Sequence, residues 1–148
     1  MKYLLSSLIL FIANLTMIAQ QGTVEIHIKL VNGLTGLPMK NQVVELEEDR
    51  TGAPHTYTTR SARTNASGIA TIRVDRDLVI LTENTHEYVD CGEEHGGLVH
   101  NDYKVSDIVF KGIVEPVALP NLCTKTSGSA KPGELLIFVR PWMPGEEI

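Results

Sequence analysis

The chain has 148 residues, of which 13 are Lys or Arg and 18 are Asp or Glu, so its formal net charge is −5. Its basic residues do not gather into a cluster, and an acidic chain of this kind lacks the positive surface that phosphate backbones attract. Nucleic acid and anionic membrane surfaces are therefore not expected as partners.

Residues 1–21 predict a cleavable signal peptide. Lys2 gives a positive start, Tyr3–Ile18 is an apolar stretch with a few polar residues, and Ala19 is the small residue near which cleavage would fall. A helix that crosses the hydrocarbon core needs about 20 mostly apolar residues, so an uncleaved N-terminal anchor is the alternative. We expect residues 22–148 to form one secreted or periplasmic domain with no membrane span.

The first strand of this domain is predicted by strict alternation of apolar and polar residues from Val24 to Leu30. Asn32 to Pro38 then supplies the residues of a turn. Further short strands are expected at 43–46, 55–60, 69–74 and 78–81, with turns between them.

The second half of the domain begins with a polar stretch, 84–105, that predicts a long loop. Apolar residues at 108–110 and 113–114 predict renewed strands, and 116–133 is a connection rich in Pro, Ser and Gly. The last strand is expected at 134–141, where the apolar run Leu136–Val139 indicates an interior position. No helical periodicity is evident, so the pattern predicts an all-β domain, an antiparallel β-sandwich of about seven strands.

Both cysteines, Cys91 and Cys123, lie in the exported part of the chain. An oxidising compartment favours a disulfide between them. The alternative, a pair of free thiols for metal or redox chemistry, lacks the Cys-x-x-Cys spacing that such sites use.

Two segments carry a family resemblance. The run Val31–Val43 contains Thr35-Gly36-Leu37-Pro38 and resembles a turn of carboxypeptidase regulatory-like domains, which are prealbumin (transthyretin)-like sandwiches. The run Thr64–Ala70 is similar to the same family's turn before its next strand, and Asn65 can cap its own backbone there. The resemblance covers about residues 23–82 and implies an immunoglobulin-like or prealbumin-like fold with an accessory role.

Two enzyme activities known on related sandwiches do not fit the sequence. Hydrolases of 5-hydroxyisourate end in Tyr-Arg-Gly-Ser, whereas this chain ends in Trp142-Met143-Pro144-Gly145-Glu146-Glu147-Ile148. Intradiol dioxygenases hold iron with two Tyr and two closely spaced His, and no His-x-His pair occurs here. We therefore expect no enzyme activity and no cofactor.

Two candidate sites are left. His86, His95 and His100 share the 84–105 stretch with several carboxylates, a set that suits a zinc ion; the alternative is a polar loop that is merely solvated. Trp142 is a candidate for binding a sugar or a partner, or it packs over the end of the core.

The leading hypothesis is an exported, non-enzymatic module that binds a partner protein or a polysaccharide of the cell envelope. A metal-binding protein or small metal-dependent enzyme that uses the 84–105 stretch is the alternative. A purely structural envelope component is the third possibility.

Overall fold

The computed structural model describes residues 22–49, 58–75, 80–83, 88–91, 102–115 and 123–142. The elements in chain order are β1 (Thr23–Asn32), β2 (Val43–Asp49), β3 (Thr58–Arg63), β4 (Ile69–Asp75), β5 (Ile80–Glu83), β6 (Val89–Asp90), β7 (Asp102–Tyr103), α1 (Val105–Lys111), β8 (Ile113–Glu115) and β9 (Glu134–Arg140). The predicted signal peptide lies outside these residues. Within them, no helix has the length and apolar character needed to cross a membrane.

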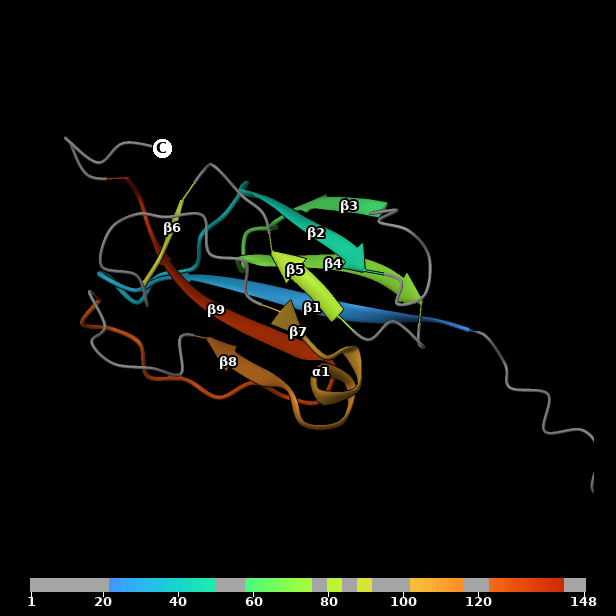
Figure 1. Ribbon diagram of the computed structural model, residues 1–148. Helices are drawn as coiled ribbons and strands as arrows, with labels where there is room; N and C mark the ends of the chain where they lie inside the picture. Colours follow the sequence, from blue (N-terminus) through green and yellow to red (C-terminus); the bar gives the residue numbers. More distant parts are fainter. Residues whose placement is uncertain are drawn as a thin grey trace, which may run out of the picture.

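The strands form two sheets that pack face to face (Figure 1). Sheet A has the order β4-β1-β9-β6, and β8 also pairs with β9. Sheet B has the order β3-β2-β5-β7. The domain is therefore mostly β, as predicted, with its first and last strands as neighbours in one sheet.

The expectation of a purely antiparallel sandwich is wrong, because β9 runs parallel to both β1 and β8. In the first pair His27 lies opposite Glu134, and in the second Ile113 lies opposite Leu135. A parallel pair needs a crossover connection of a dozen or more residues, and the stretch 116–133 has that length. Apolar residues alternate with the same period in parallel and antiparallel strands, so the sequence pattern did not reveal the parallel pairing.

A helix, α1, stands where the apolar run 108–110 predicted a strand. Val105 and Ile108 are buried and Val109 packs against the core, which is the three- and four-residue spacing of one helix face. Gly112, at a φ of 74°, ends the helix, and its N–H donates to the carbonyl of Ile108 at 3.0 Å. Within the stretch predicted as a loop at 84–105, the described residues include the short strands β6 and β7.

The main core lies between the two sheets. It includes alternate residues of β1, β4 and β9 and two residues of β2; these are Ile26, Ile28, Leu30, Val44, Leu46, Ala70, Ile72, Val74, Leu135, Ile137 and Val139. Their burial confirms the inward face that alternation predicted for the first strand.

A second, smaller cluster lies on the outer face of sheet A. It consists of Val31, Cys91, Cys123, Leu136 and Phe138, all buried. Part of the 123–133 segment covers this face so closely that a Cβ on Gly128 would lie 2.7 Å from Cδ2 of Leu136. β9 is thus buried on both faces, which confirms the interior position predicted for Leu136–Val139.

The turn predicted at 64–68 is formed as expected. The side-chain oxygen of Asn65 accepts the N–H groups of Ser67 at 2.8 Å and Ile69 at 3.1 Å, and Gly68 has a φ of 74°. The adjacent Thr64 is buried and ties this turn to the chain between β1 and β2: its hydroxyl donates to Met39 O at 2.7 Å and accepts from Gln42 N at 2.9 Å.

Candidate functional site

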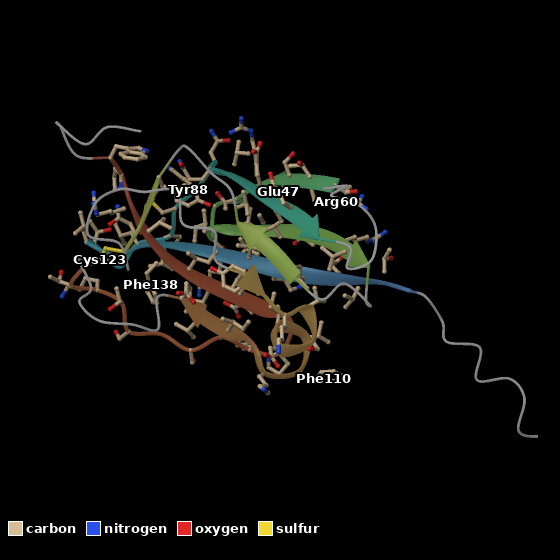
Figure 2. All side chains as sticks on the ribbon, viewed as in Figure 1. Glu47, Arg60, Tyr88, Phe110, Cys123 and Phe138 are labelled. Carbon is tan, nitrogen blue, oxygen red and sulfur yellow. A yellow bond between two sulfur atoms is a disulfide. The ribbon has the colours of Figure 1, made fainter. Side chains whose placement is uncertain are left out.

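The predicted disulfide between Cys91 and Cys123 is present, with the two Cα atoms 5.4 Å apart. The two residues are 32 positions apart in the chain and both are buried. The bond lies at one end of the sandwich, beside the label of Cys123 in Figure 2. It fixes the start of the 123–133 segment to the residue that follows β6.

Gly33 makes a close contact with this disulfide. A Cβ on Gly33 would lie 2.3 Å from Sγ of Cys91 and 2.6 Å from Cβ of Cys123, so only glycine fits. Its N–H donates to Val139 O at 2.8 Å, and its carbonyl accepts the N–H of Lys125 at 2.7 Å. The sequence identified Gly33 only as a turn residue, because nothing in the sequence indicates which segments approach it.

The turn that begins at Asn32 is held by a set of internal hydrogen bonds. The side-chain oxygen of Asn32 accepts from Leu34 N at 2.9 Å and Thr35 N at 3.1 Å, and its carbonyl accepts from Gly36 N at 2.7 Å. Its own N–H donates to Leu37 O at 2.8 Å. Because Gly33 also rests on the disulfide, we call residues 32–38 the braced turn.

The braced turn displays two apolar side chains to solvent. Leu34 is 39% exposed and Leu37 is 64% exposed, although the turn geometry depends on Asn32 and Gly36 and not on either leucine. Phe110 on α1 is the other large apolar side chain that is exposed among the described residues. Figure 2 shows Phe110 well away from the disulfide.

The C-terminal end of β9 carries the candidate Trp142 and a residue that the sequence did not suggest. Trp142 is half-buried, so it is neither a fully displayed aromatic nor a core residue, and its binding role stays a prediction. Arg140 is 1% exposed, and its Nη1 donates to the carbonyl of Pro141 at 3.4 Å. A buried guanidinium is unusual, and no spacing rule would have identified it.

The three candidate zinc ligands, His86, His95 and His100, lie outside the described residues, and the zinc hypothesis stays a prediction. Among the residues that the structure describes, no group of three or more His, Cys, Asp or Glu side chains is placed to hold a metal ion.

The outer faces of β1 and β4 form a polar surface next to the covered part of sheet A. Nδ1 of His27 and Oγ1 of Thr71 are 3.1 Å apart, and Arg73 forms an ion pair with Glu25 at 3.6 Å. Both pairs are exposed, so each stabilises the fold by less than about 1 kcal/mol.

Comparisons with protein-family models, with curated proteins and with solved structures found no significant match. The resemblance to carboxypeptidase regulatory-like domains therefore rests on its turn residues.

Proposed function

We propose that this chain is an exported, non-enzymatic module that binds a partner of the cell envelope through the braced turn. The observation that carries the proposal is the display of Leu37, 64% exposed, on a backbone fixed by hydrogen bonds and by the disulfide behind it. A single exposed leucine needs no explanation, but Leu34 and Leu37 are exposed together on the braced turn.

A rigid apolar tip is a favourable binding element. Ordering a loop on association costs free energy, and a loop that is already ordered avoids that cost. Burial of each leucine in a complex would contribute about 1.5–3 kcal/mol at most. Leucine offers no hydrogen bonds to sugar hydroxyls, so the turn favours a protein over a polysaccharide as the partner.

The test is capture of partners from an envelope extract by the immobilised, purified protein. The Leu34→Ser/Leu37→Ser variant removes the apolar tip and leaves the turn's hydrogen bonds in place. Phe110→Ser is the control, because it removes an exposed apolar side chain on a different element, α1, whose exposure is close to that of Leu37. We expect the wild type and Phe110→Ser to capture the same partner. The affinity of the double variant for that partner should be lower by about tenfold or more.

A partner that the double variant captures as well as the wild type does would contradict the proposal. A glycan array tests the polysaccharide alternative. Glycan binding that survives the double variant but is lost in Trp142→Ala would move the site from the braced turn to Trp142.

A further inference from the structure

Each sheet has an outer edge that no described strand covers. Sheet A ends at β4, which pairs with β1, and sheet B ends at β3, which pairs with β2. The two edges lie along the same side of the sandwich, joined by the turn at 64–68 (Figure 1).

The hydrogen bonds around β4 reveal which of its backbone groups face outward. Leu30 N donates to Gly68 O at 2.8 Å, so in the antiparallel pairing with β1 the even-numbered residues of β4 direct their N–H and C=O groups toward β1. The odd-numbered residues therefore direct theirs toward the open edge. Ile69 confirms this alternation, because its carbonyl accepts from Asn65 N and its N–H donates to the Asn65 side chain.

Thr71 and Arg73 are the next odd-numbered residues along this edge. Within the described part of the chain, their N–H and C=O groups face outward with no strand to pair with. An edge of this kind is a template for a further strand.

The other edge is less suited to pairing. β3 has the sequence Thr-Thr-Arg-Ser-Ala-Arg, and Arg60 and Arg63 place positive charge along it, a common protection against edge association. β4 carries the apolar residues Ala70, Ile72 and Val74 on its inner face, with only Arg73 as a basic residue.

We propose that β4 pairs antiparallel with β4 of a second copy of this chain, about a two-fold axis at Ile72. In this register each Thr71 lies opposite Arg73 of the second copy, so the outward N–H and C=O groups of both residues find partners. Ile72 lies opposite its own copy and Ala70 opposite Val74, so the apolar inner layer continues across the junction.

Charge selects this register over its neighbour. Centring the axis on Arg73 would place two guanidinium groups directly opposite each other, which is destabilising. Centring the axis on Ile72 separates the two guanidinium groups. In each copy, Glu25 also lies 3.6 Å from Arg73 and balances the charge of that arginine. The surface is distinct from the braced turn, and a dimer would carry two such turns, which would strengthen binding to a repetitive partner.

The test is sedimentation velocity of the purified exported protein over a wide concentration range. Thr71→Pro removes the outward N–H without removing a backbone hydrogen bond to β1, a change that edge strands tolerate, and it also removes the exposed hydroxyl beside His27. Ser61→Pro is the matched control, because Ser61 also faces outward by the same alternation but on β3. We expect concentration-dependent dimers for the wild type and Ser61→Pro, and at least a tenfold weaker dimer for Thr71→Pro.

Amide hydrogen exchange of the wild type gives a second measurement that does not depend on the folding of a variant. Exchange at Thr71 and Arg73 should slow as the protein concentration rises, whereas exchange at Thr59 and Ser61 should not change. The proposal would be overturned by a wild type that stays monomeric at every concentration, or by a Thr71→Pro variant that dimerises equally well. It would also be overturned if amide exchange at Thr71 slowed only when a different protein was added.

Discussion

Gly33 lies so close to Cys91 that a Cβ on the glycine would be 2.3 Å from the cysteine sulfur. Gly33→Ala should therefore force the turn and the disulfide apart and lower the free energy of unfolding by about 3 kcal/mol, as severe overpacking does. Urea unfolding measures the change. In a Cys91→Ala/Cys123→Ala background the sulfurs are gone but Cβ of residue 123 remains, so the cost should shrink in part; an equal cost in both backgrounds would refute the contact with the sulfur of Cys91.

Removing the disulfide itself should be costly. The bond closes a loop between residues 32 positions apart, and the chain-entropy model gives a stabilisation of about 3–4 kcal/mol for such a loop. We expect Cys91→Ala/Cys123→Ala to unfold at correspondingly lower urea concentration. Reduction of the wild type under the same conditions is the control. A loss below about 1 kcal/mol would mean that the segments stay together without the bond.

Thr64→Val keeps the shape of a buried side chain but removes its hydroxyl. The carbonyl of Met39 and the N–H of Gln42 would each lose a hydrogen-bond partner, which should lower the free energy of unfolding by about 1–3 kcal/mol. Thr64→Ser retains the hydroxyl and should recover most of this loss. Equal destabilisation by Val and Ser would show that the methyl group, not the hydroxyl, matters at this position.

Phe138 and Phe110 form a matched pair for testing the outer cluster. Phe138 is 2% exposed and contributes to the cluster beneath Gly128, whereas Phe110 is 69% exposed on α1. Phe138→Ala should cost about 3–5 kcal/mol, and Phe110→Ala about 0.5 kcal/mol or less. Thermal or urea unfolding compares them directly. Similar values for the two variants would mean that the outer cluster is not a true second core.

The sequence predicted those features that depend on neighbouring residues. Alternation from Val24 to Leu30 identified the inward face of the first strand, and the apolar run Leu136–Val139 identified an interior strand. The Asn65 turn was predicted because its hydrogen bonds are local.

Features that depend on distant segments were missed. The alternation of apolar residues is the same in a parallel and an antiparallel strand, so it does not show the direction of β9 beside β1. The apolar run of three residues from Ile108 is too short to distinguish a helix from a strand. At the site, the cysteine pair was predicted from compartment and count, but the contact of Gly33 with it was not. The exposure of Leu34 and Leu37 depends on which residues the core leaves outside, and only the packed structure reveals that.

The position of β9 also determines when the domain can fold. β9 pairs with β1, about a hundred residues earlier in the chain, and it lies between β1 and the strands β6 and β8. Such distant pairing forms slowly, and here it must wait until β9 has been synthesised. Until then β1 lacks a neighbour along one edge and the main core lacks its contribution from β9. A nascent chain with this order of pairing therefore keeps β1 and the main core incomplete until β9 emerges.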